Sequence, residues 1–380
     1  MSLRDHRLAL LPALALTALT AAACGGSGTG GTTTGADGSI TVTAKDDSCD
    51  VGETELAAGR YSFEVTNSGG KVTEFYVYAE GDRVMAEVEN IAPGLSRDLL
   101  VELPAGEYEA TCKPGMVGDG IRSTLTVTGK AASLSEDESL ARAATDYQRY
   151  VRSQTAALID RTTAFVQAVK GGDVEGAKAL YPVARGYWER IEPVAESFGD
   201  LDPKIDGRDG DQAEGEEFTG FHRIEQVLWE TGDVSDMGPI ADRLLTDVEE
   251  IVARADDTTL APLQLANGAK ALLDEVATGK ITGEEERYSH TDLWDFAANL
   301  EGSQAAVQAL RPYLQDADPD LVAEIDDRFA STEAELEQYR DGDGWMLHER
   351  LTDEQLRGLS DAITALTESV SRVAAVVAGR

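Results

Sequence analysis

The sequence predicts a two-domain protein of the β + α class, in which a β-sandwich precedes an all-α helical bundle. Short β-branched and aromatic runs, separated by Gly, Asn, Asp and Pro turns, fill the chain up to about residue 129. After Gly129 this alternation gives way to Ala, Leu, Glu, Arg and Gln, with apolar residues three and four positions apart. Of the 380 residues, 42% are apolar, which is enough material for two buried cores.

The N-terminus has the pattern of a bacterial lipoprotein signal. Basic residues precede the apolar run LALLPALALTALTAAAC, which reaches Cys24 through small residues and is followed by a Gly/Thr/Ser-rich stretch. We predict a signal peptide at 1–23, a lipidated Cys24 and a flexible tether at 24–37; secretion with a free Cys24 is the alternative. No later stretch is long and apolar enough to span a membrane. The predicted location is extracytoplasmic, in the periplasm or at the outer face of the cytoplasmic membrane, with a lipid anchor as the only membrane attachment.

The charge balance limits the partners. The chain carries 70 Asp and Glu against 33 Lys and Arg, a net charge of −37. Such a field repels polyanions and raises the local concentration of cations. We therefore expect no nucleic-acid partner.

The first domain is predicted at 38–129 as an antiparallel β-sandwich. Its strands are expected at 39–46, 60–70, 73–82, 97–112 and 123–129. The run LPAGEYEATC, with KPGM after it, resembles the end of a cupredoxin domain, where the last strands and their loop carry a Cys and a Met. A blue-copper site also takes two His. No His lies between Cys24 and His222, so blue-copper electron transfer is excluded.

Two cysteines and three glutamates are the candidate functional residues of this domain. Cys49 and Cys112 either form a disulfide, which an oxidising compartment allows, or act as thiolate ligands of a metal. In the second case, carboxylates of Glu74, Glu87 or Glu89 would complete a copper or iron site. The residue types permit both alternatives.

The region 135–380 is predicted to form a bundle of eight helices. The helices are expected at about 135–170, 174–199, 216–231, 236–255, 259–278, 291–311, 318–340 and 353–378. Ser135 with Glu138, and Thr352 with Gln355, have the spacing of capping boxes and indicate two helix starts.

Two pairs of side chains in this region have metal-ligand spacing. His222 and Glu225 lie one turn apart in the apolar segment GFHRIEQVLWE, and helical bundles build metal sites from His and carboxylates at this spacing. Glu189 and Glu192 lie one turn apart among the aromatic and apolar residues of ARGYWERIEPVAESF. Buried carboxylates repel each other unless a metal, a proton or an Arg neutralises them.

The structural alternative for this second pair is a salt-bridge network with Arg185 and Arg190. Two further candidate ligands are Asp206, in LDPKID, and Glu285, in the run EEERYSHTDLWDF. That run also holds Tyr288, His290 and Asp292. For His348 we expect a surface or packing role.

In combination, these motifs resemble a known family. The pieces YWERIEP, DPKID, GFHRIE and GEEERYSHTDLWDF, after a sandwich with ENIAPG and GEYEATC, are similar to those of the EfeO-type bacterial iron-uptake proteins. The resemblance covers nearly the whole mature chain. The helical domain of that family is similar to imelysin, or peptidase-like, proteins, known for a Gly-x-His-x-x-Glu signature that stands here at 220–225. The resemblance implies a cupredoxin-like sandwich followed by an imelysin-like helical domain.

The same resemblance implies where metal binds. The matching positions in the helical domain are Glu189, Glu192, Asp206, His222, Glu225 and Glu285. Oxygen ligands with a single imidazole suit iron, Fe2+ or Fe3+, better than Cu(I), and leave zinc as an alternative. For the sandwich the family implies a second, cupredoxin-type site, for which copper is an alternative metal. Its matching positions are Cys49, Glu74, Glu87, Glu89 and Cys112.

The expected function is the capture of Fe2+ or Fe3+ outside the cytoplasm and its hand-over to a membrane permease, without catalysis. The resemblance implies two partners, an iron permease of the EfeU type and a haem peroxidase of the EfeB type. One alternative is a binding protein for a polysaccharide or another cell-wall partner, bridged by a cation. A metallopeptidase is the other, although the His-Glu-x-x-His motif of zinc peptidases is missing from the sequence.

Overall fold

The computed structural model describes residues 36–198, 201–212, 215 and 217–379. The predicted signal peptide and Cys24 lie outside the described residues. So does the predicted tether, except that its last two residues, 36 and 37, belong to the first strand. Within the described ranges, no helix is both long and apolar enough to cross a membrane.

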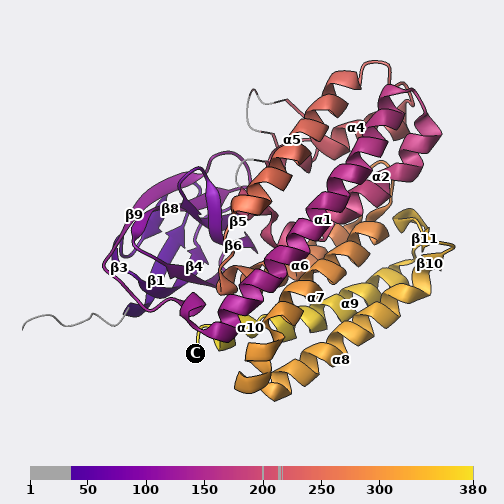
Figure 1. The fold of residues 1–380 in the computed structure, drawn as a ribbon. Helices are drawn as coiled ribbons and strands as arrows, with labels where there is room; N and C mark the ends of the chain where they lie inside the picture. The colour runs from indigo at the N-terminus through magenta and orange to yellow at the C-terminus, as the bar shows by residue number, and fades with distance from the viewer. Residues whose placement is uncertain (1–35, 199–200, 213–214, 216, 380) are drawn as a thin grey trace, which may run out of the picture. The chain divides into compact units, whose positions relative to one another are not determined.

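Nine strands form the two main sheets of the N-terminal domain (Figure 1). They are β1 (Ala36–Ala44), β2 (Cys49–Val51), β3 (Glu55–Ala57), β4 (Gly59–Asn67), β5 (Thr73–Ala79), β6 (Arg83–Ile91), β7 (Ser96–Leu103), β8 (Gly106–Pro114) and β9 (Ile121–Thr128). One sheet has the order β2-β1-β4-β7 and the other β3-β9-β8-β5-β6. Their inner faces share one core, in which the rings of Phe63 on β4 and Phe75 on β5 lie 5.4 Å apart. The predicted β-sandwich is confirmed.

Most strand pairs of the sandwich are antiparallel, as predicted, but two are parallel, which corrects the prediction in part. β1 pairs with β4 in parallel, and β3 pairs with β9 in parallel. The reason is that β3 joins the opposite sheet, so the chain returns to the first sheet in its original direction. β6 was not predicted, because only Ala86, Val88 and Ile91 of its nine residues are buried.

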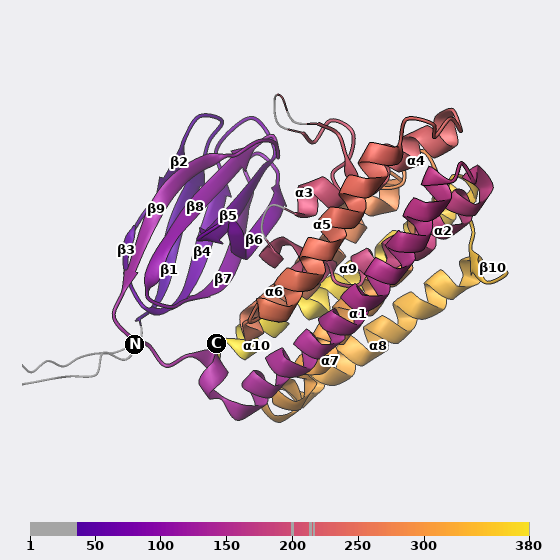
Figure 2. The ribbon, with the colours of Figure 1, turned by 45° about the horizontal axis from the view of Figure 1, so that its top comes forward.

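Ten α-helices and five short 3₁₀ helices are described after the sandwich (Figure 2). The α-helices are α1 (Glu138–Lys170), α2 (Val174–Glu189), α3 (Asp202–Ile205), α4 (Gly220–Glu230), α5 (Gly238–Asp257), α6 (Pro262–Thr278), α7 (Asp292–Ala317), α8 (Pro319–Leu336), α9 (Asp353–Val370) and α10 (Val373–Val377). The 3₁₀ helices are η1 (Leu134–Glu136), η2 (Glu192–Phe198), η3 (Lys280–Thr282), η4 (Glu337–Tyr339) and η5 (His348–Arg350). A two-stranded hairpin, β10 (Arg340–Asp341) with β11 (Gly344–Trp345), lies between η4 and η5.

Several predicted helix boundaries differ from the structure: the helix expected at 216–231 begins at Gly220, the one at 291–311 extends to Ala317, and the one at 353–378 divides into α9 and α10. Two further differences have a local cause. The helix expected at 174–199 ends at Glu189 and continues as η2, because Pro193 has no N–H to donate to the helical ladder. The capping box expected at Ser135 does not form, and Asp137 instead caps α1 by accepting from the N–H groups of Ser139 and Leu140. The second capping box, at Thr352, forms as predicted.

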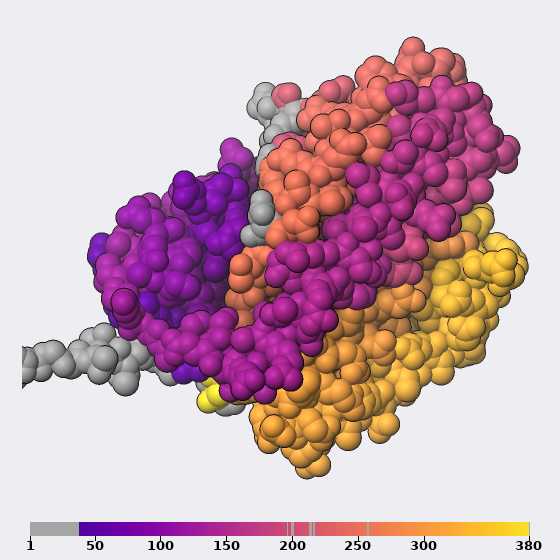
Figure 3. Space-filling model, in the orientation of Figure 1, coloured from indigo at the N-terminus to yellow at the C-terminus, as the bar shows by residue number. Residues whose placement is uncertain are grey.

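The helices surround a hydrophobic core of their own. α1 packs against α2, α5 and α7, while α6 packs against α7 and α9. Figure 3 shows α1 and α5 side by side on one surface of the helical domain. This core is separate from the core of the sandwich, so each domain buries its own apolar residues.

Candidate metal centre

Four of the six predicted ligands of the helical domain, Glu189, Asp206, His222 and Glu285, contact one arginine, Arg185 of α2, whose side chain is fully buried. Five acidic side chains from four segments form ion pairs with its guanidinium: Glu189, Asp206, Glu285, Glu286 and Asp295. Its Nη2 donates to Glu285 Oε1 at 3.0 Å, and its Nε lies 2.5 Å from Glu286 Oε1. The salt-bridge alternative therefore holds for Arg185. Arg190 pairs instead with Glu301.

His222 stands between two groups of carboxylates. Its Nε2 lies 3.4 Å from Asp206 Oδ1 and 3.5 Å from Glu285 Oε1. Its Nδ1 lies 3.1 Å from Glu225 Oε2, on the same face of α4. Ligand atoms of Asp206, His222 and Glu285 all lie within 4.8 Å of one another, and so do those of His222, Glu225 and Glu286. The imidazole of His222 thus belongs to two clusters of side chains, each with the ligand atoms to hold a cation.

Two backbone features place this histidine. α4 begins at Gly220 with φ of +81°, and a Cβ there would stand 2.3 Å from the carbonyl oxygen of Ile205. Only glycine fits that conformation and that approach, which explains the Gly in the Gly-x-His-x-x-Glu signature. Glu225 Oε1 accepts the N–H groups of Tyr288 and Ser289 at 3.0 and 2.8 Å. Glu225 thereby links α4 to the loop that carries Glu285 and Glu286.

The other predicted pair, Glu189 and Glu192, is held by Lys280. The Lys280 Nζ donates to Glu189 Oε2 at 2.9 Å and to both oxygens of Glu192 at 2.7 and 2.8 Å. Asn299 Nδ2 donates to the same two carboxylates, at 2.7 Å each. Glu285 lies between the two halves, since its Oε1 is 3.8 Å from Lys280 Nζ and 3.0 Å from Arg185 Nη2.

Positive neighbours keep part of the site ionised. Burial would raise the pKa of Asp206, but Arg185 and then His222 lower it below its ordinary value. Burial also opposes ionisation of Glu285, yet Lys280 leads the positive groups that hold its pKa well below the usual range. Burial and Arg185 would lower the pKa of His222, but its hydrogen bonds to carboxylates raise it well above the ordinary value.

The surroundings raise the pKa of other carboxyl groups of the site. Burial, and then the charge of Glu225, raises the pKa of Glu286 to about 8. Burial raises the pKa of Asp295 well above its ordinary value, and burial with the charge of Glu189 does the same for Glu192. Metal ligands must be deprotonated, so a cation that binds here would release protons.

Sequence reasoning missed several members of this site. Lys280 and Asn299 are buried and donate to Glu189, and the buried Asp295 pairs with Arg185. Glu286, next to the predicted Glu285, is also buried and pairs with Arg185. Asp292, Asp295 and Asn299 recur at helical spacing on α7, which was a readable signal. His290 and His348 contact Glu349 and the Ile281 carbonyl, respectively, rather than a predicted ligand.

Of the two alternatives predicted for the cysteines of the sandwich, the structure has the disulfide. Cys49 and Cys112 are bonded to each other, with their Cα atoms 5.6 Å apart. Sulfurs in a disulfide are not thiolates, so the predicted site with both cysteines as ligands is not formed in this oxidation state. Across the described part of the chain, the two clusters of metal-ligating side chains both lie in the helical domain.

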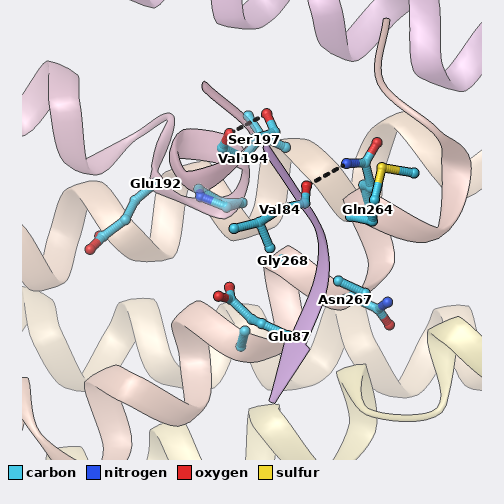
Figure 4. A pocket seen from close by; sticks show the side chains of 12 residues that line it. Val84, Glu87, Glu192, Val194, Ser197, Gln264, Asn267 and Gly268 are labelled. Atoms are coloured by element: carbon cyan, nitrogen blue, oxygen red, sulfur yellow. Dashed lines mark hydrogen bonds between the residues drawn. The ribbon is translucent and has the colours of Figure 1, made fainter. Parts of the chain in front are cut away.

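The three predicted glutamates of the sandwich contact a tyrosine or line a cavity. Tyr76 Oη donates to Glu74 Oε2 at 3.2 Å and to Glu89 Oε1 at 3.0 Å. Glu87, on β6, lines a cavity of about 40 Å³ between the sandwich and the helices. Figure 4 shows Glu192 of η2 among the side chains that line the same cavity. A carboxylate metal site in the sandwich stays a prediction.

Comparisons with known proteins agree with this architecture. Residues 143–373 match the imelysin family over more than half of the chain. The chain belongs to the imelysin family. Residues 8–127 match the cupredoxin-like domain, so this imelysin protein carries a cupredoxin-like N-terminal region.

Relatives of this imelysin protein include components of bacterial iron uptake systems. Iron uptake system component EfeO of Escherichia coli O157:H7 is 41% identical over 345 residues, which cover 89% of this chain and 91% of that one. The EfeO proteins of Escherichia coli K12 and Shigella flexneri show the same identity and coverage. The predicted resemblance to the EfeO-type proteins is thereby confirmed, as is the fold class.

Proposed function

We propose that this chain captures iron, as Fe2+ or Fe3+, in the buried centre of its helical domain and hands it to a membrane permease. Its relatives at 41% identity are named components of an iron uptake system. The observation that carries the proposal is the group of Asp206, His222 and Glu285, whose ligand atoms lie within 4.8 Å of one another. Several carboxylate oxygens with one imidazole form a donor set that suits iron and also admits zinc.

The remaining predicted ligands extend this centre. Glu225 holds His222 in place from the Nδ1 side, and Glu189 reaches the same arginine as Asp206 and Glu285. Glu192 has the most exposed side chain of the site, at 15%, and lines the cavity beside β6. We propose that the cation enters at Glu192 and that the net charge of −37 raises the cation concentration outside this entrance.

The cellular setting of the proposal rests on the N-terminus and on the relatives. A signal peptide at 1–23 and a lipid on Cys24 would hold the protein outside the cytoplasm and near a permease. The proposed partners are an iron permease of the EfeU type and a haem peroxidase of the EfeB type. Binding and release, without turnover, are sufficient for this role.

The test is an anaerobic titration of the lipid-free mature protein with Fe2+, with Zn2+, Cu2+ and Ca2+ as competitors. We expect tight binding of iron in the wild type. Glu189→Ala and His222→Ala should each weaken it by about 100-fold or more, since even residues that only orient ligands cost 10- to 100-fold.

Two matched variants control for the loss of an acid or an imidazole elsewhere. Glu301 is exposed and pairs with Arg190, and His290 is half-exposed and pairs with Glu349. Glu301→Ala and His290→Ala should therefore bind iron as the wild type does. Absence of stoichiometric binding in the wild type, or full binding in Glu189→Ala and His222→Ala, would refute the proposed function.

A further inference from the structure

Lys280 is a buried positive side chain whose ammonium group faces three carboxylates. Its side chain is 2% exposed, and its Nζ contacts three carboxylates. The distances are 2.9 Å to Glu189, 2.7 Å to Glu192 and 3.8 Å to Glu285. These are three of the six carboxylates and imidazoles that the proposed function assigns to iron.

An ammonium group and a metal ion compete for these oxygens. Lys280 and Asn299 already donate to both Glu189 and Glu192, so an ion bound to this pair would have to share its oxygens with both donors. A divalent ion within a few ångströms of the ammonium would also be repelled by it, and strongly so in a buried place. A cation that uses the Glu189–Glu192 pair therefore has to displace the lysine.

Resting on the proposed function, we infer that Lys280 is a tethered competitor of the metal. It neutralises Glu189 and Glu192 in the empty site and leaves them when the ion binds. It thereby lowers the affinity for the ion and favours its release. A carrier that hands over its ion benefits from such a competing group. Without one, the carboxylates would release the ion only to a site that binds it at least as tightly.

The local structure lets Lys280 move more easily than Arg185. Lys280 is the first residue of η3, a helix of three residues between α6 and the loop that carries Glu285 and Glu286. Arg185 lies inside α2 and pairs with five acids from four segments, so it has no comparable freedom. Glu275, on the last turn of α6, also attracts Lys280 and offers the displaced ammonium a second partner.

The test compares Fe2+ affinities of the wild type, Lys280→Gln and Lys280→Arg under the same anaerobic conditions. Removal of the competing charge in Lys280→Gln should tighten binding by about tenfold or more, which corresponds to at least about 1.4 kcal/mol. Lys280→Arg keeps the charge and should not tighten binding. Lys170→Gln is the matched control, since Lys170 pairs with Asp242 on the surface and its loss changes the net charge equally.

The outcomes separate this inference from the proposed function. Iron binding by the wild type tests the function, whereas the ratio of variant to wild-type affinity tests the inference. If Lys280→Gln binds iron equally or more weakly while folded, as judged by circular dichroism, Lys280 is a structural ion-pair partner and the inference is overturned.

A second measurement needs no variant. An amine-reactive label, read by mass spectrometry, should modify Lys280 slowly in the metal-free protein, where its Nζ is buried and bonded. Saturation with Fe2+ should increase this labelling, while labelling of Lys170 stays constant. Labelling of Lys280 that iron leaves unchanged or reduces would also overturn the inference.

Discussion

The surroundings of each buried carboxyl group decide whether it carries a charge or a proton. Asp206 and Glu286 both contact Arg185, yet the pKa of Asp206 falls while that of Glu286 rises to about 8. Burial raises the pKa of both groups and Arg185 lowers it, but a hydrogen bond to His222 lowers the pKa of Asp206 further, whereas the charge of Glu225 raises that of Glu286. A site of this kind gains or loses metal together with protons.

The sandwich provides a simple test of such a group in Glu74. Burial raises its pKa from 4.5 to about 7, against the opposing effect of Lys113. Between these pH values the folded chain keeps a proton that the unfolded chain releases, so the stability contributed by this group falls as pH rises through the window. Glu74→Gln mimics the protonated form and removes this loss.

We therefore expect Glu74→Gln to match the wild type at pH 5 and to exceed it by about 2–3 kcal/mol at pH 8. Chemical denaturation at both pH values measures the difference. Glu64→Gln, at an exposed position of β4, is the control and should show no such pH dependence. An equal effect of Glu74→Gln at both pH values would mean that the carboxyl group is ionised in both.

At the scale of elements, a close contact between two backbones positions the metal centre. A Cβ on Gly268 of α6 would lie 1.7 Å from the carbonyl oxygen of Pro193 in η2. Glu192, next to Pro193, therefore reaches Lys280 and Glu189 because α6 has no side chain at this point. The glycine serves the approach of η2, although it weakens α6 as an isolated helix.

Gly268→Ala separates these two effects. Helix propensity predicts that alanine stabilises α6 by up to about 1 kcal/mol. The close contact predicts the opposite, a loss of about 1–3 kcal/mol from overpacking, together with weaker iron binding as Glu192 is displaced. Denaturation and iron titration read both effects. Gly238→Ala, at the start of α5 where a Cβ meets open space, should change neither.

At the scale of the whole chain, the two domains have separate cores and are joined by hydrogen bonds and by the apolar side chain of Leu100, which packs against the helical core. Asn267 Nδ2 of α6 donates to the Leu100 carbonyl at 2.6 Å, and the Leu134 N–H donates to Glu102 at 3.0 Å. The disulfide lies wholly within the sandwich and closes a loop with a sequence separation of 63 residues. Its loss should therefore affect the sandwich and leave the metal centre intact.

The double variant Cys49→Ala/Cys112→Ala tests this independence. Loop-closure entropy predicts that the sandwich loses about 4 kcal/mol of stability. The iron stoichiometry and affinity of the helical domain should equal those of the wild type. Calorimetry and iron titration check the two statements. A fall in iron stoichiometry would place a metal at the cysteines or make the domains interdependent.

The sequence by itself determined the order of the two folds and most of the candidate ligands. Alternation of period two predicted the strands at both ends of the sandwich, and helical spacing placed His222 and Glu225 on one face of α4. Such patterns are readable because burial of a strand or helix face is a local property. The sequence also identified Cys49 and Cys112 as candidate functional residues, but it did not distinguish a disulfide from a pair of metal ligands.

Only the tertiary structure decided what surrounds those ligands. Arg185 meets Glu285 across 100 residues of chain, and Lys280 meets Glu189 across 91. The parallel pairing of β1 with β4 also depended on contacts between segments that are not neighbours in the sequence. Local patterns record how much of a side chain is buried, but not which charge lies opposite it. The charged partners of a side chain are decided when the packed helices bring separate segments of the chain into one site.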